Sequence, residues 1–135
     1  MSGATDDAEM LRQILFYCES IEEVFDECGT DRDNFIDKKR RFEFDVCAFY
    51  IGLIGEHVNK LTKEFRAGHS EIPWRQIIGL RNRIFHDYIS VRKDQLFDVM
   101  LDEIPKLHEQ CQSLLRELEP TAEKINDDQG DRDER

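Results

Sequence analysis

The chain has 135 residues and a formal net charge of −11, and 36% of its residues are charged. That length predicts a single domain with a core large enough to fold without disulfides or a structural metal. The acidic charge argues against a protein whose overall field attracts RNA. No apolar run reaches the roughly 20 residues that a transmembrane helix needs, so no membrane association is expected.

The four cysteines and the N-terminus indicate the compartment. No two cysteines have the spacing of a zinc site, and their positions among apolar residues predict reduced thiols in the core. The N-terminus is acidic rather than basic and then apolar, which is not the pattern of a signal peptide. We therefore expect a cytoplasmic protein with no metal site, and no cofactor is signalled.

Apolar residues recur at helical spacing along the chain and predict an all-α protein. Short connections between such amphipathic helices favour an antiparallel bundle of four to five helices. An irregular turn is expected around residues 87–91. The long helices are expected at about 8–28, 38–65, 73–86 and 93–118.

Outside these helices the sequence predicts two disordered ends. Residues 1–7 are expected to be disordered, and residues 120–135 to form an acidic disordered tail. Residues 8–119 would then be the folded domain. Within the last helix Pro105 lacks a backbone donor and crowds the preceding turn, so a kink is expected there.

The third helix carries an arginine in its apolar stripe. Burying a guanidinium without a partner costs several kcal/mol, a large part of a domain's stability. Arg81 must therefore meet an internal carboxylate, for which Glu56 on the second helix is the obvious candidate, or face an interface where an anion binds. The stripe consists of Ile77, Ile78, Arg81, Ile84, Phe85 and Tyr88.

His86 follows five residues after Arg81 and is the side chain best suited to move protons near neutral pH. At 100° per residue, the two side chains point about 140° apart on an ideal helix, whereas Asn82 and His86 are only about 40° apart. One rigid helix does not assemble an Arg–His pair. Either the helix breaks at His86, or a second subunit brings its own copy of the motif.

Simpler interpretations exist for each of these residues. His86 could be a hydrogen-bonding residue at a helix end, and Tyr88 a core aromatic residue with a satisfied hydroxyl. The basic run at residues 38–41 is more typical of a solvated helix start than of an RNA contact. Residues 81–93 carry four cations against one carboxylate, so a local patch able to bind phosphate is still compatible with the acidic chain.

The segment from Ile72 to Tyr88 resembles the signature of the HEPN superfamily, and within it the HepT-like toxins. Its R-x4-H-x-Y motif corresponds to Arg81, His86 and Tyr88, with the polar Asn82 after the arginine. The Ile54-Gly55-Glu56 step on the second helix is also similar, and the resemblance extends over residues 11–115. The chain departs from the family pattern at residues 45–50, where family members often carry an arginine and an asparagine.

The resemblance implies a dimeric helical bundle that cuts RNA without metal, with Arg81 and His86 of both subunits in the dimer cleft. It also implies the toxin half of a toxin–antitoxin pair, whose partner is a minimal nucleotidyltransferase antitoxin. That partner would neutralise the toxin by adding AMP to Tyr88. The alternatives are a non-catalytic HEPN-like dimer that docks a nucleotidyltransferase and, more weakly, a purely structural bundle.

In the ribonuclease interpretation each motif residue has a role. His86 would act as base or acid in an internal transesterification, and Arg81 would stabilise the charge on the phosphorane oxygens. Asn82 would orient His86 or the phosphate, and Glu56 would hold Arg81 in place. Tyr88 would donate a hydrogen bond to phosphate, and AMP on its hydroxyl would block the site by bulk and charge.

Overall fold

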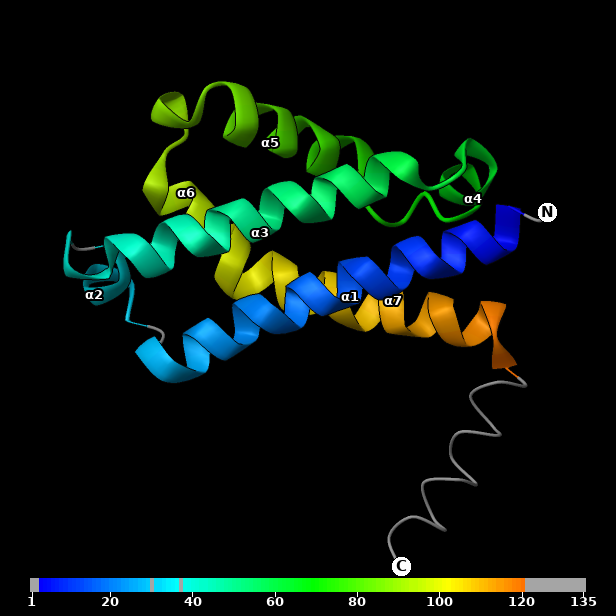
Figure 1. Ribbon diagram of the computed structural model, residues 1–135, viewed down its shortest axis with the longest axis horizontal. Coiled ribbons are helices and arrows are strands. Elements are labelled where there is room, and N and C mark those ends of the chain that lie inside the picture. Colours follow the sequence, from blue (N-terminus) through cyan, green and yellow to red (C-terminus); the bar gives the residue numbers. More distant parts are fainter. Residues whose placement is uncertain (1–2, 30, 37, 121–135) are drawn as a thin grey trace, which may run out of the picture.

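The computed structural model describes residues 3–29, 31–36 and 38–120, and in these ranges the chain is helical without strands. Four long segments run alternately in opposite directions, as Figure 1 shows, so the predicted all-α antiparallel bundle is confirmed. In the described ranges no helix is long and apolar enough to cross a membrane. The α-helices are α1 (Gly3–Cys28), α2 (Arg32–Ile36), α3 (Arg41–Lys60), α4 (Lys63–Gly68), α5 (Trp74–His86), α6 (Lys93–Asp98) and α7 (Ile104–Leu118).

Three shorter segments join these helices. The 3-10 turn η1 (Lys38–Arg40) leads into α3, and a second, η2 (Tyr88–Ser90), follows α5. A π-helical turn, η3 (Val99–Glu103), connects α6 to α7. The sequence therefore predicts the positions of the long helices and the irregular turn at residues 87–91, where η2 lies, but neither η1 nor the π-helical form of η3.

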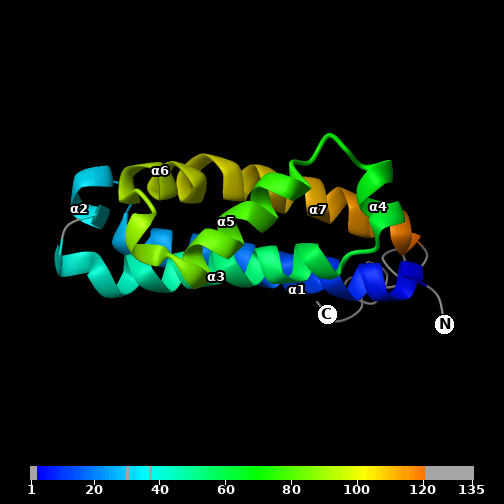
Figure 2. The ribbon, with the colours of Figure 1, turned by 90° about the horizontal axis from the view of Figure 1, so that it is seen from above.

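The central helix α3 packs against both α1 and α5, and α1 also packs against α7. Figure 2 shows α5 lying obliquely over α3, with α6 and α7 alongside. At one end of the bundle four buried phenylalanines from α1, α2, α3 and α6 form a cluster in which Phe35 is central. Its ring centroid lies 4.7 Å from that of Phe25, 5.6 Å from that of Phe97 and 6.2 Å from that of Phe44. Such tilted aromatic contacts join the short helices to the core.

The N-terminal end of α1 differs from the expectation of disorder. Residues 3–7 belong to α1, and Asp7 is a buried polar side chain. Its two carboxylate oxygens accept hydrogen bonds from the backbone N–H and the hydroxyl of Thr62, both at 2.8 Å. A buried carboxylate is retained only where such donors meet it, so residues 3–7 are ordered by a tertiary contact that the local sequence does not reveal.

The predicted second helix, residues 38–65, is divided at the residue that makes this contact. Leu61 leaves α3 with an extended backbone, and Thr62 caps α4 by accepting a hydrogen bond from the Phe65 N–H at 3.1 Å. The stripe of apolar residues continues through this break, so periodicity alone indicated one helix. The capping threonine was the local signal for a new helix start.

Pro105 is accommodated by the π-turn η3. The Ile104 N–H donates to the Val99 carbonyl, five residues back. Pro105 then lies in the first turn of α7, where its missing N–H breaks no hydrogen bond within that helix. The irregularity expected at this proline is therefore present, in the form of a π-turn just before it. Met100 within this turn and Ile104 and Leu107 after it are all buried.

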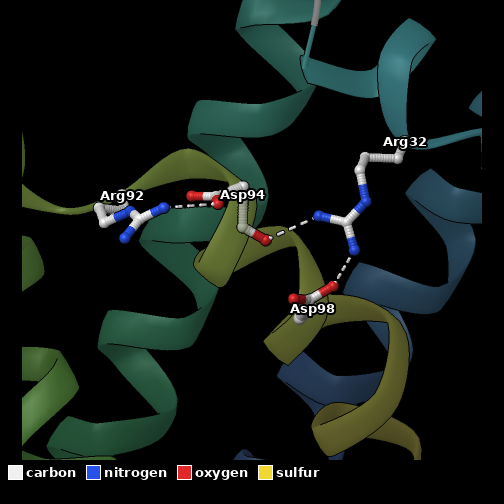
Figure 3. A network of polar contacts seen from close by, with 4 residues as sticks. All are labelled: Arg32, Arg92, Asp94 and Asp98. Carbon is white, nitrogen blue, oxygen red and sulfur yellow. Dashed lines mark hydrogen bonds and ion pairs between the residues drawn. The ribbon is translucent and has the colours of Figure 1, made fainter.

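Polar contacts at the same end of the bundle as the phenylalanine cluster tie α2 to α6 (Figure 3). Arg32 donates to the Asp94 carbonyl at 3.0 Å, forms an ion pair with Asp98 and lies over the ring of Phe97 at 5.0 Å. Arg92 pairs with the Asp94 side chain at 2.9 Å. Because these groups are largely exposed, their pairs add only modest stability, and the network positions α2 rather than forming a binding site.

Candidate functional site

Helix α5 carries the motif and stays helical through His86. Asp87 then leaves the helix with φ −156° and ψ 53°, and its N–H donates to the Arg83 carbonyl. The break predicted after residue 86 is therefore confirmed, but it comes too late to turn His86 toward Arg81. Within the described ranges no hydrogen bond joins these two side chains, as the helical angle of about 140° predicts.

Arg81 meets the carboxylate that the sequence indicates. Its Nε and Nη2 donate to Glu56 Oε1 at 2.8 and 2.6 Å, and its Nη1 donates to Asn82 Oδ1 at 2.6 Å. The hydrogen bond from Arg81 lowers the pKa of the Glu56 carboxyl below its usual value. The Arg81 side chain is still 24% exposed, so the held guanidinium keeps a face toward solvent. Asn82 therefore contacts Arg81, whereas the sequence suggested that Asn82 orients His86 or the phosphate.

Two glycines of α3 allow α5 to approach closely. A Cβ atom added to Gly55 would lie 2.3 Å from Arg81 Cβ, and one added to Gly52 would lie 2.5 Å from the Phe85 ring. Neither position has room for a side chain, so the stem of Arg81 rests directly on the α3 backbone beside Glu56. The sequence pointed to Gly55 only through its family resemblance. The spacing of Gly52 and Gly55 on one helix face was the available signal for close packing.

Tyr88 has a partner that the sequence analysis missed. Its hydroxyl donates to Asp45 Oδ1 at 2.5 Å, and the other oxygen of Asp45 accepts from Arg41 Nε at 3.0 Å. Burial and this hydrogen bond raise the pKa of Tyr88 above its usual value, so the phenol stays protonated. Asp45 precedes Glu56 by eleven residues, or about three helical turns, so helical periodicity could have placed both carboxylates on one face.

His86 is exposed, and its side chain makes no hydrogen bond or ion pair with the rest of the described structure. Exposed apolar side chains lie on α3 and η2, and the partly buried Phe85 of α5 contacts one of them. We call Phe42, Phe49, Phe85 and Ile89 the apolar face; Phe42, Phe49 and Ile89 are 77%, 52% and 99% exposed. The Phe49 and Phe85 rings lie 5.9 Å apart, and Arg81 lies 5.7 Å from the Phe85 centroid. The motif therefore borders a surface of the kind that partners cover.

Among the described residues, metal-ligating side chains and cysteine thiols form no second candidate active site. Among the described residues no group of three or more metal-ligating side chains converges. Burial raises the pKa of the Cys47 and Cys111 thiols to about 12, so neither is an activated nucleophile. Arg41, from the basic run, is engaged with Asp45 on its own helix, as the interpretation of a solvated helix start expects.

Comparison with known proteins places these residues in a family. A family model described as "Ribonuclease HepT-like" matches residues 14–114. A "Putative RNase" of Caldanaerobacter subterraneus subsp. tengcongensis is 40% identical over 66 residues, which are 49% of this chain and 59% of that protein. A "Probable ribonuclease HepT" of Thermococcus cleftensis is 30% identical over 99 residues, which are 73% and 86% of the two chains.

A third relative shows the same match within a longer protein. A "Gamma-glutamylcyclotransferase and putative RNase" of Methanocaldococcus jannaschii is 32% identical over 109 residues, which are 81% of this chain and 47% of that protein. The matched segment thus spans roughly half of several of these relatives. No solved structure gives a significant match.

Proposed function

Because the chain belongs to the ribonuclease HepT-like family, we propose that it is an endoribonuclease whose active site combines Arg81 and His86 at a homodimer cleft. The observation that supports this most directly is the placement of the two side chains on α5. Arg81 is held by Glu56 with one face open to solvent, and His86 is exposed and unpaired within the described ranges. A fixed cation and an unpaired imidazole, brought together in a dimer cleft, suit reaction at a phosphodiester.

The proposed reaction is an internal transesterification. The ribose 2′-oxygen attacks phosphorus, the O2′–P bond forms and the P–O5′ bond breaks, leaving a 2′,3′-cyclic phosphate and a 5′-hydroxyl. One His86 takes the 2′-hydroxyl proton and the other gives a proton to the departing 5′-oxygen. Arg81 stabilises the charge on the phosphorane oxygens, while Glu56 and Asn82 hold its donor fork. The residues' roles need no metal ion.

A second subunit supplies what one helix lacks. Arg81 and His86 face different ways on α5. The Arg81 guanidinium lies 5.7 Å from the Phe85 centroid in the apolar face, and His86 follows Phe85 in the chain. An isologous dimer through that face would bring two copies of each side chain into one cleft and cover the exposed phenylalanines. The dimer is therefore part of the proposal. It would let Arg81 and His86 act together although they diverge on one helix, and it would cover the exposed apolar side chains.

Activity is tested by incubating the purified wild-type chain with single-stranded RNA in the presence of a metal chelator. We expect cleavage to continue in the chelator and the products to carry 2′,3′-cyclic phosphate ends. A 2′-deoxy substitution at the cleaved position should stop the reaction, because the attacking oxygen is gone. Intact RNA after incubation with the folded wild-type protein would remove the ribonuclease proposal.

Neutralisation by a nucleotidyltransferase antitoxin is the second part of the proposal. Tyr88 attacks the α-phosphorus of ATP, the Oη–P bond forms, pyrophosphate leaves and the tyrosine proton is released. Tyr88 is only half-buried, and its hydroxyl need only leave Asp45 to become accessible. The added AMP would place a negative charge beside the site, where substrate phosphate must bind.

Co-expression with such an antitoxin is expected to raise the mass of the wild-type protein by one AMP unit or a multiple of it. Tyr88→Phe removes the acceptor oxygen and the Asp45 hydrogen bond but keeps the ring, so its mass should stay unchanged. Intact-protein mass spectrometry makes this comparison, with Tyr50→Phe as the matched tyrosine control. A mass increase that persists in Tyr88→Phe would contradict the assignment.

The acidic charge supports a second candidate function, a non-catalytic dimer that docks a nucleotidyltransferase. A net charge of −11 repels RNA at long range, and Arg81 already has a carboxylate partner. The two functions differ in one result. The docking module binds the antitoxin and leaves RNA intact, whereas the ribonuclease cuts RNA before the antitoxin is added.

A further inference from the structure

An open cleft of about 620 Å³ lies at the junction of α4 and α5, away from Arg81. It contains two arginines and no carboxylate, which is unusual for a surface of this acidic chain. Its polar groups also include a serine and a glutamine. The lining residues are Arg66, Ala67, Ser70, Ile72, Pro73, Trp74, Arg75, Gln76 and Ile78.

The two arginines have no partner in the described parts of the chain. Arg66 Nε is buried and has no hydrogen-bond acceptor, and neither Arg66 nor Arg75 forms an ion pair there. Most other arginines of the described structure, such as Arg12, Arg32 and Arg41, do pair with carboxylates. A guanidinium without a carboxylate partner keeps its accessible donors available for an anion in the cleft.

The backbone around the cleft is held in place by tertiary contacts. The Arg66 N–H donates to the Thr62 carbonyl at 3.1 Å, and Thr62 is itself bound by the buried Asp7. The Trp74 indole N–H donates to the His69 carbonyl at 3.0 Å, which joins the end of α4 to the start of α5. The stems of Arg66 and Arg75 therefore start from fixed positions, as a preorganised binding site requires.

The cleft is aligned with the motif along α5. Arg75, Gly79, Asn82 and His86 follow the spacing i, i+4, i+7 and i+11 and therefore share one stripe of the helix. Gly79 leaves this stripe open, because an added Cβ would meet nothing within 4 Å. With a rise of about 1.5 Å per residue, Arg75 lies roughly 16 Å along the axis from His86, a distance that a few nucleotides span.

We propose that this cleft, through Arg66 and Arg75, binds a backbone phosphate of the substrate RNA a few nucleotides from the cleaved bond. The proposal rests on the ribonuclease function proposed above. The guanidinium forks bind the phosphate oxygens, and the strand crosses the open Gly79 position on its way to Asn82 and His86. This local pair of cations adds affinity for RNA, which the net negative charge of the chain opposes.

The test compares the wild-type chain with the double variant Arg66→Gln/Arg75→Gln. The matched control is Lys106→Gln/Arg116→Gln, which removes two exposed cations from α7. Affinity for a fully 2′-O-methylated, uncleavable oligonucleotide is measured over a range of salt concentrations. We expect the Arg66/Arg75 variant to bind about tenfold more weakly and to lose roughly 0.7 of the log–log salt slope for each phosphate contact. The control should bind nearly as the wild type does.

Cleavage separates this site from the reacting centre. For a long oligonucleotide the Arg66/Arg75 variant should have a raised KM and a nearly unchanged kcat, since binding remote from the reaction is lost. For a dinucleotide, too short to reach the cleft, wild type and variant should be cut equally. Equal binding of the uncleavable oligonucleotide by both proteins overturns this inference and leaves the ribonuclease proposal standing. Failure of the wild type to bind or cut RNA overturns both.

Discussion

Replacing His86 with alanine is expected to lower the rate of RNA cleavage by about 100-fold or more, because proton transfer by a positioned side chain contributes that much. The fold should survive, since the side chain is exposed and unpaired in the described structure. Initial cleavage rates and circular dichroism measure the two effects. His86→Gln keeps a polar side chain but cannot exchange a proton near neutral pH, so the same loss is expected. Cleavage by His86→Ala at the wild-type rate would contradict the assignment.

Mixing the wild type with His86→Ala tests whether the site is shared between subunits. A mixed dimer holds one His86, whereas the proposed reaction uses the His86 of both subunits. Once the subunits exchange, an excess of His86→Ala should therefore lower the cleavage rate per wild-type subunit severalfold. A rate per wild-type subunit that stays unchanged after exchange would contradict a site built across the dimer.

The second large effect is expected at Gly55. An alanine there would place its methyl group 2.3 Å from Arg81 Cβ and 3.0 Å from the Ile77 carbonyl oxygen, so α5 must move away from α3. We expect Gly55→Ala to lower the free energy of unfolding by about 2 kcal/mol through overpacking. Cleavage should fall as well, because the displaced Arg81 loses its alignment with Glu56.

Gly79→Ala is the matched control on the facing helix. It lies in the interior of α5 with open space around its Cβ position, so alanine should raise the free energy of unfolding by up to about 1 kcal/mol. Urea unfolding monitored by circular dichroism measures both variants. Equal stability of Gly55→Ala and wild type would show that the α3–α5 contact is looser than the structure indicates.

The Arg81–Glu56 ion pair could be predicted from the sequence. An arginine in an apolar stripe requires a partner, and Glu56 was the carboxylate available in the next stripe, so their contact was predicted. The Tyr88–Asp45 contact was not, because it joins residues 43 positions apart across two helices and a 3-10 turn. The catalytic roles of Arg81 and His86, and the modification of Tyr88, stay predictions.

The sequence by itself determined the class of fold, the position of the long helices and the end of α5 near His86. These follow from local causes: hydrophobic periodicity, helix-breaking residues and the residues of the motif. Only the tertiary structure decided how closely α5 approaches α3 and that Asp7 binds Thr62 at the start of α4. It also decided which carboxylate meets Tyr88 and that Arg66 and Arg75 share a cleft. Such features depend on contacts between distant segments, as between Asp7 and Thr62, and helical spacing carries no record of them.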